Sequence, residues 1–172
     1  MKGYKIPTLL NNFNTYAAGH KYVGVSSETT LPEFEYLTET LEGAGIAGDI
    51  EEAVEGCFGS LESETSFQNI GEEYFHFLAN TGIVTQRGSM QVLNTATQTN
   101  DFESVVVTTK GRVKSFELGT LKRGGKGNPK IVRELTYVKI MIGGQNVLEL
   151  DKFNMIWKVN GVDRLQKVRS QI

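Results

Sequence analysis

An acidic, glycine-bearing segment at residues 39–55 is the feature that most constrains this chain. It holds six acidic residues, no basic residue and three glycines, and it lies between two predicted strands. Hairpin loops usually contain about two to five residues, so an ordered loop of this length in a compact domain usually has a function. Four apolar residues in it need burial that a solvated loop does not supply. They are Leu41, Ile46, Ile50 and Val54.

We therefore predict a long inter-subunit loop, residues 39–56, that docks on a neighbouring copy of the chain. Glycines permit backbone conformations closed to other residues and let another chain approach closely. The alternative is a loop that folds back over its own sheet. The residues assigned to the contact are Leu41, Glu42, Gly43, Gly45, Ile46, Gly48, Asp49, Ile50, Glu51 and Glu52.

Charge is distributed unevenly along the chain, although the net charge is only −2. Residues 1–80 contain thirteen acids and three bases, a balance of −10, whereas residues 81–172 contain seven acids and fifteen bases, a balance of +8. The acidic and the basic half of the chain pair either within one fold or head to tail between two copies. In a contact between copies, opposed electrostatic potentials set the register and the choice of partner. The overall charge gives no reason to expect tight nucleic-acid binding, which needs an uncompensated basic surface.

A basic, glycine-rich loop at residues 120–130 complements the acidic segment. Its spacing differs from that of a phosphate-binding loop. Phosphate contact and a role in solubility are alternatives, but the matching acidic segment in the same chain favours pairing. The residues assigned to this basic partner loop are Lys122, Arg123, Lys126 and Lys130.

The chain length supports one domain, residues 1–172, with its own hydrophobic core. Nineteen glycines and few long helical patterns favour β-structure with turns. Only one cysteine is present, Cys57, so no disulfide within the chain is expected. The first residues lack the apolar core of a signal peptide, and no apolar run approaches the ~20 residues of a membrane span.

Alternation of polar and apolar residues predicts the strands, after an extended N-terminal arm at residues 1–19. A helix is predicted at residues 71–80, because acids occupy its first turn and an apolar stripe follows. Asp163 is expected to cap a short terminal helix at residues 164–171. The predicted strands are 20–25, 29–40, 56–69, 83–98, 102–120 (with a turn at 99–101), 131–142, 147–150 and 153–159, the last two flanked by turns at 143–144 and 160–161.

Residues suited to catalysis or metal binding are few. His20, His76 and Cys57 do not have the spacing of a zinc motif. His76 lies among aromatic residues, which favours a packing role over a general base. Glu62 and Glu64 are two residues apart on one polar strand face, where carboxylates are usually solvated. We predict no catalytic residue, no cofactor and no metal site.

Several segments resemble the major tail tube proteins of contractile-tailed bacteriophages, and the resemblance covers essentially the full length. None of these segments is a catalytic motif, so the similarity is a whole-chain pattern. The polar residues 164–167 depart from the family's usual ending. The segments that carry the resemblance are residues 1–7, 11–14, 30–35, 38–48, 148–154 and 159–163.

The resemblance implies a mainly β fold of two packed antiparallel sheets, a β-sandwich or partial barrel with one short helix, whose strands join a hexameric inner β-barrel. Rings would stack into the hollow tube of a virion tail, assembled in the bacterial cytoplasm, through which DNA passes. The expected partners are further copies of the chain, the tail sheath, baseplate and tail-terminator proteins, without membrane insertion. The alternative is the inner tube of a headless bacteriocin or a secretion apparatus.

The polar strand faces agree with this architecture, because a barrel shared among subunits has a water-filled channel. Carboxylates on its wall would repel DNA phosphates, so that DNA slides through instead of binding. Two other classes remain open: a monomeric ligand-binding β-barrel, which needs an apolar cavity, and an enzyme with a carboxylate pair in a cleft. The residues assigned to the channel wall are Glu33, Glu35, Glu62 and Glu64.

Overall fold

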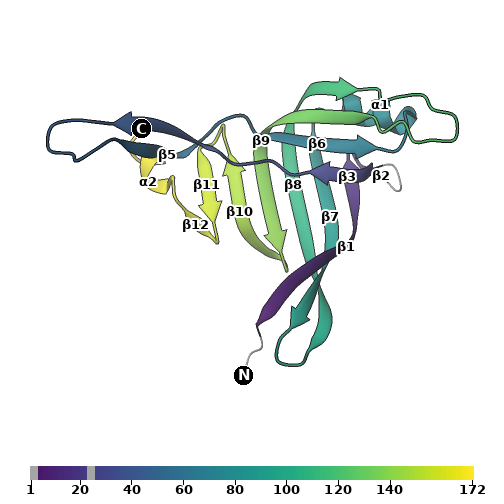
Figure 1. Cartoon of the computed structure of the whole chain (residues 1–172), viewed down its shortest axis with the longest axis horizontal. Helices are drawn as coiled ribbons and strands as arrows, with labels where there is room; N and C mark the ends of the chain where they lie inside the picture. The colour runs from purple at the N-terminus through teal and green to yellow at the C-terminus, as the bar shows by residue number, and fades with distance from the viewer. Residues whose placement is uncertain (1–3, 23–25) are drawn as a thin grey trace.

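A computed structural model describes residues 4–22 and 26–172 and shows a mainly β protein, as predicted. In this part of the chain, twelve strands and two short helices follow one another (Figure 1). They are β1 (Lys5–Ala17), β2 (His20–Tyr22), β3 (Ser26–Thr30), β4 (Tyr36–Leu41), β5 (Ile50–Phe58), β6 (Glu62–Phe67), α1 (Glu72–Ala79), β7 (Ile83–Asn94), β8 (Thr99–Glu117), β9 (Lys130–Ile142), β10 (Gln145–Asp151), β11 (Ile156–Val159), β12 (Val162–Asp163) and α2 (Gln166–Arg169).

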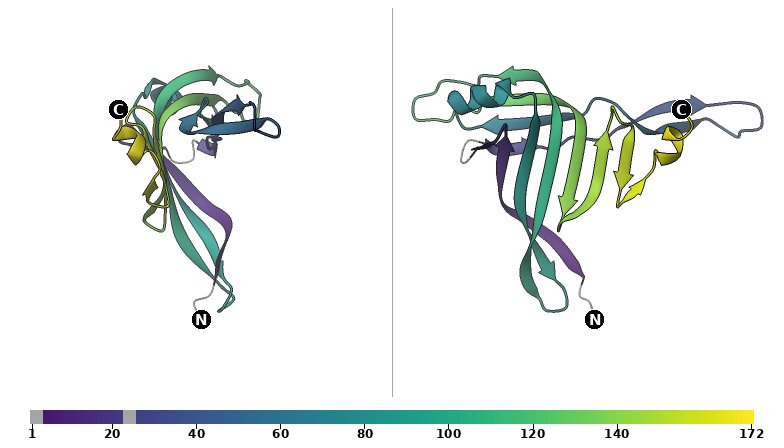
Figure 2. Two further views of the ribbon diagram at one scale, coloured as in Figure 1. Left: turned by 90° about the vertical axis from the view of Figure 1, so that its left-hand side faces the viewer. Right: turned by 180° about the vertical axis from the view of Figure 1, so that it is seen from behind.

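Ten strands form one antiparallel sheet that forks at β9. The main path is β12-β11-β10-β9-β8-β7-β1-β2, and β6 joins β9 separately, with β3 beyond it. Residues 130–134 of β9 pair with β6, whereas residues 137–142 pair with β10. The fork produces two layers. The short layer comprises β3, β6, the start of β9 and residues 111–117 of β8. The long layer comprises the rest of the sheet. Figure 2 shows that the short layer lies over one side of the long layer.

The bend between the layers requires a glycine in β8. The register of β8 against β9 shifts between Lys110 and Gly111, and again between Val113 and Ser115. A Cβ at Gly111 would lie 2.1 Å from the backbone oxygen of Glu134, so no larger residue fits without moving the strands. Such close approach of two backbones is a position where glycine is used.

Two clusters of buried side chains fill the space between the layers. The cluster beneath α1 includes Tyr74 and Phe77, whose rings meet Phe67 edge to face. Buried Arg133 lies in β9, and its guanidinium donates hydrogen bonds to the carbonyl oxygens of Gly82 and Gly111; burial lowers its pKa to about 10. The other cluster comprises Phe58, Leu61, Leu135, Val138, Leu150, Trp157 and Leu165.

Some predicted elements are confirmed and others are wrong. The helix at α1 and the turn at Gly143 and Gly144 are confirmed, and both glycines have positive φ. The predicted strand at 29–40 is wrong, because residues 31–35 are irregular and separate β3 from β4. The strand at 56–69 is likewise interrupted between β5 and β6. Residues 23–25 of the strand predicted at 20–25 lie outside the described residues.

Side-chain hydrogen bonds explain two further errors. The turn predicted at residues 99–101 lies at 95–98, because the Asn94 side-chain oxygen accepts hydrogen bonds from the backbone of Ala96 and Thr97. The strand predicted at 153–159 begins at Ile156. The Asp151 carboxylate accepts hydrogen bonds from the backbone N–H of Phe153, and of Asn154, which turns the chain there.

Candidate assembly surfaces

Residues 36–58 form a projecting hairpin, so much of the segment predicted as a long loop at residues 39–56 is paired strand. Strands β4 and β5 pair outside the main sheet, and Figure 1 shows them extending from one end of the molecule. The tip, residues 42–49, contains Gly45 and Gly48 with φ of +95° and +119°, backbone angles that favour glycine. The hairpin therefore contains every residue that the sequence assigned to an inter-subunit contact.

One face of this hairpin carries four exposed aliphatic side chains, with the opposed pair Glu39 and Glu52 between them, and no described element covers it. Leu41 and Ile50 are directly opposite each other, and alternation places Leu37 and Val54 on the same side. These four side chains are 46–52% exposed. The opposite face carries small or polar residues, including Thr40 and Ala53. We name the side with the four aliphatic residues the hairpin's apolar face.

The hairpin also carries unbalanced negative charge. Glu39 and Glu52 are directly opposite each other, an arrangement that destabilises an isolated strand pair. Glu55 lies 3.6 Å from Arg164. The remaining acids form no ion pair with any residue that the structure describes; they are Glu39, Glu42, Asp49, Glu51 and Glu52. An isolated two-stranded hairpin is at best marginally stable, so this one has the properties of a segment that another chain completes.

A basic loop projects from the opposite end of the molecule, between β8 and β9 (Figure 1). Its base is held by the backbone N–H of Gly127, which donates to the Gln68 carbonyl and to the Asn69 side chain. Its tip is exposed, and Leu121 is 93% exposed. Lys122, Arg123 and Lys126 lie at this tip and form no ion pair within the described residues.

Lys130 differs from the other residues assigned to this loop. It is the first residue of β9, and its ammonium nitrogen is 2.8 Å from the Glu64 carboxylate. The hydrogen bond that Lys130 donates to the Glu64 carboxylate raises the pKa of Lys130. Because its charge is already balanced within the chain, we leave Lys130 out of the proposed partner loop.

The polar face of the short layer carries paired charges. Alternation along β6 buries Ser63 and Thr65 and turns Glu62 and Glu64 outward. Glu62 pairs with Lys114, whose pKa is raised by this hydrogen bond, and Glu64 pairs with Lys130. Two of the four predicted channel residues are thus neutralised by lysines from neighbouring strands. These ion pairs cannot be read from the sequence, because only the register of three strands that are distant in the chain brings the groups together.

Glu134 extends this ion-pair network. It is opposite Glu62 in the register, and its carboxylate lies 3.8 Å from the ammonium nitrogens of both Lys114 and Lys152. Burial would raise the pKa of Glu134, but hydrogen bonds from Ser60 and from the backbone of Leu61, with the two lysine charges, lower it overall.

The other two predicted channel residues, Glu33 and Glu35, lie in the irregular segment before β4. Both are exposed and form no ion pair with the described residues. Phe34 lies between these two glutamates in the chain, and Tyr36 follows the second. Both aromatic side chains point to the opposite side and pack on the core around Phe58. The predicted alternation of inward and outward residues is therefore present, although the continuous strand is not.

Both edges of the short layer are open. In the described structure β3 pairs with β6 alone. Residues 111–117 of β8 pair with β9 alone, because the pairing of β7 with β8 ends at Ile83 and Lys110. Unpaired strand edges are sites where another chain adds on, unless they are covered.

Metal-ligand clusters are absent from the described residues. These residues contain no group of three or more His, Cys, Asp or Glu side chains that would hold a metal ion. His20 and His76 stack with ring centroids 6.3 Å apart, and Cys57 is an exposed free thiol. An apolar cavity between the strands β1, β7 and β8 on one side and Thr29 and Leu31 on the other measures only about 120 Å³. No helix in residues 4–22 and 26–172 has the length and apolar character needed to cross a membrane.

Open strand edges, an uncovered apolar hairpin and opposite charges at the two ends define a class of protein: a β-subunit that further chains complete. Comparison with known proteins agrees with this class. The family described as phage tail tube protein FII matches residues 7–172, and the chain belongs to this family. It is 31% identical over 172 residues to the tail tube protein of Escherichia phage P2, covering 97% of this chain and 98% of the relative. It is 24% identical over 157 residues to the major tail tube protein of Serratia phage KSP20, covering 91% and 90%.

Proposed function

We propose that this chain is the structural subunit of a contractile phage tail tube, in which copies close into hexameric rings and the rings stack. The observation that carries the proposal is the pair of open edges on the short layer, in a chain of the tail tube family. Joining the β3 edge of one copy to residues 111–117 of the next continues the sheet around a ring. Closure leaves no free edge, which is the way barrels avoid uncontrolled pairing. The number six follows from the resemblance to major tail tube proteins.

The hairpin and the basic loop join neighbouring copies in this proposal. They project from opposite ends of the molecule, so the hairpin of one copy reaches the loop of another without folding back on its own subunit (Figure 1). Lys122, Arg123 and Lys126 balance the acids, including the opposed pair Glu39 and Glu52. The apolar face of the hairpin is covered in the same contact, and burial of its aliphatic side chains stabilises the joint.

The polar face of the short layer lines the channel in the same arrangement. Glu33 and Glu35 contribute free carboxylates, whereas Glu62 and Glu64 neutralise Lys114 and Lys130. A wall with paired lysines and free carboxylates offers DNA phosphates no net attraction, which suits a conduit for DNA ejection.

Membership of the tube family supports the remaining parts of the proposal. The chain acts as a structural component of the virion tail, assembled in the host cytoplasm, and is not an enzyme. Its partners are the sheath around the tube and the baseplate and terminator proteins at its ends. The inner tube of a headless bacteriocin or a secretion apparatus is the second candidate, since the subunit surfaces required are the same.

The first test is the assembly state of the purified chain. We expect rings or hollow tubes in negative-stain electron micrographs, and a sedimenting species of at least hexamer mass. A protein that stays monomeric at all concentrations, with its hairpin protected from proteolysis, would contradict the proposal.

A charge-reversal experiment tests the contact between hairpin and loop. Changing Lys122, Arg123 and Lys126 to Glu should prevent tube formation, because like charges then face each other across the contact. Changing Glu42, Glu51 and Glu52 to Lys should prevent it as well. Mixing the two variants, or combining all six changes in one chain, should restore tubes in part. Sedimentation measures each outcome, and unimpaired tubes from either single-sided variant would refute the pairing.

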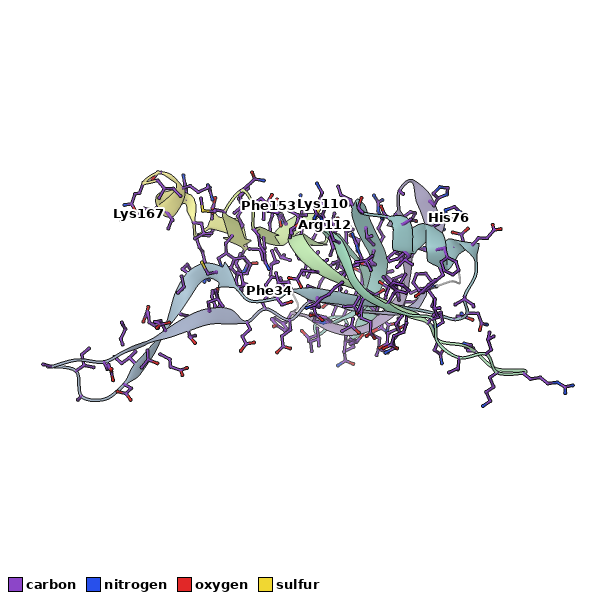
Figure 3. All side chains as sticks on the ribbon, turned by 90° about the horizontal axis from the view of Figure 1, so that it is seen from above. Phe34, His76, Lys110, Arg112, Phe153 and Lys167 are labelled. Carbon is purple, nitrogen blue, oxygen red and sulfur yellow. The ribbon has the colours of Figure 1, made fainter. Side chains whose placement is uncertain are left out.

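A labelling experiment tests the channel wall. In a Cys57→Ser background, Glu62→Cys or Glu33→Cys carrying a bulky maleimide label should add density inside the tube and narrow the channel in cross-section. Lys167→Cys is the matched control and should add density outside, because Figure 3 shows Lys167 on the same side as Lys110 and Phe153, away from the hairpin and the basic loop. Density from the Glu62 label on the outer wall would show that the polar face of the short layer lies on the outside of the tube, which would contradict the proposed channel wall.

A further inference from the structure

The face of the long layer turned away from the short layer is not covered by any described element. Alternation in β7, β8 and β9 buries Val84, Thr109 and Val138 on the inner side. Their neighbours Ile83, Lys110 and Tyr137 lie on the other side, which we name the outer face. Figure 3 shows Lys110, Arg112 and Phe153 gathered on this side, while the hairpin and the basic loop lie toward the other.

An exposed aromatic side chain stands on the outer face between two hollows. Phe153, in the turn after β10, is 82% exposed, and Ile83 beside it is 54% exposed. One hollow, of about 270 Å³, lies between Phe153, Tyr137 and Ile83. The other, of about 280 Å³, lies between Phe153, Thr136 and Arg112, and Lys110 borders both. Each hollow is large enough to receive an aliphatic side chain against the Phe153 ring.

Positive charge on this face is in excess. Four cations of β7, β8 and β9 at this face form no ion pair with any residue that the structure describes, and the strand registers place three of them on the outer face with Arg112 at the bend. The two acids that β10 places on this face are already engaged: Glu149 accepts hydrogen bonds from Tyr137 and Asn146, and Asp151 holds the turn at Phe153. Hydrogen bonds from Asn154 and Phe153, and the nearby Lys110 charge, outweigh burial and lower the pKa of Asp151, so it remains ionised. The four cations are Arg87, Lys110, Arg112 and Lys139.

We propose that the outer face docks an acidic segment of a different protein that surrounds the tube, with an aliphatic side chain seated against Phe153. The proposal rests on the function proposed above, because ring closure through the short layer turns this face outward. Charge complementarity selects an acidic partner, and the exposed ring beside two hollows selects one with an apolar anchor. A second copy is disfavoured as the occupant, because its acidic hairpin is engaged by the basic loop.

Two synthetic peptides serve as probes: one with aspartates flanking a Leu-Leu pair, and a matched one with Ser-Ser in its place. Fluorescence anisotropy measures their binding to the unassembled subunit and to assembled tubes. We expect the Leu-Leu peptide to bind both forms about tenfold more tightly than the Ser-Ser peptide. A difference of this size corresponds to the binding free energy gained when roughly one pair of aliphatic side chains is partly buried. Phe153→Ser should remove that difference, and Lys110→Glu with Arg112→Glu should weaken both peptides at least about tenfold.

The control is Lys167→Glu, a similar charge change at the far end of the same side in Figure 3, which should leave binding unchanged. The proposal would be overturned if the Lys110 and Arg112 variant bound the peptides as tightly as the wild-type chain does. It would also be overturned if the wild-type chain did not prefer the Leu-Leu peptide. Loss of tubes in the Lys110 and Arg112 variant would overturn it as well, because the face would then be a contact between copies. Peptide binding by the subunit but not by the tube would also overturn it. Failure of the proposed function is distinguishable, since the wild-type chain would then form no tubes.

Discussion

Replacing residues 39–52 with Asn-Gly is expected to leave a folded subunit that no longer forms tubes. Thr38 and Ala53 are directly opposite each other, so a two-residue turn closes the hairpin at that pair without changing its register. Tyr36 and Phe58, which pack on the core, lie outside the deletion. Circular dichroism should show a melting transition close to that of the full chain, while electron microscopy and sedimentation show no tubes.

A milder pair of variants separates the contribution of the aliphatic side chains from that of the acidic charge. Leu41→Ser with Ile50→Ser should raise the critical concentration for assembly at least about tenfold, because each half-exposed side chain then contributes roughly 1 kcal/mol less on burial. Thr40→Ser with Ala53→Ser alters the opposite face of the same strands and should leave that concentration unchanged. Normal tubes from the shortened chain, or equal effects of the two pairs, would exclude the hairpin as the joint between copies.

Gly111→Val is expected to prevent stable folding rather than assembly alone. A Cβ at this position would lie 2.1 Å from the Glu134 carbonyl oxygen and 2.9 Å from the Leu135 Cα, and neither backbone atom can move without opening the fork of the sheet. Overpacking of this kind costs about 3 kcal/mol or more. The buried Arg133 would also be disturbed, because it donates a hydrogen bond to the Gly111 carbonyl.

Chemical denaturation of the soluble subunit measures this effect, and the fraction recovered after expression gives a second readout. Gly43→Ala is the matched control, since its added Cβ meets nothing within 4 Å and its backbone angle is ordinary for any residue. It should change the unfolding free energy by less than about 0.5 kcal/mol. A Gly111→Val protein as stable as the wild type would show that the two layers can separate at the bend.

Local chemistry was sufficient to predict several elements. The acids in the first turn and the aromatic stripe of α1 act within one short segment, so their effect is visible in the sequence. The same holds for the Gly143 and Gly144 turn. Side-chain direction depends on backbone sterics at each residue and its immediate neighbours, and these interactions need no knowledge of the rest of the fold.

Pairing partners were not predictable in the same way. Residues 29–40 alternate throughout, yet the chain leaves the main sheet after β3 and begins a separate hairpin at β4. Alternation reports which way side chains face, whereas strand identity depends on which other strand supplies the hydrogen bonds. For the same reason, Glu62 was assigned to a carboxylate wall although Lys114 of β8 neutralises it.

By itself the sequence determined that the chain is a β-protein with one well-formed helix, an acidic segment with apolar residues to bury and a basic loop to match it. These properties follow from composition and from interactions between residues close in the chain. The tertiary structure alone decided that the sheet forks at Gly111 and Glu134, that its short layer has two open edges, and that hairpin and basic loop stand at opposite ends. These features arise from contacts between residues far apart in the chain, whose geometry exists only once all the strands have paired.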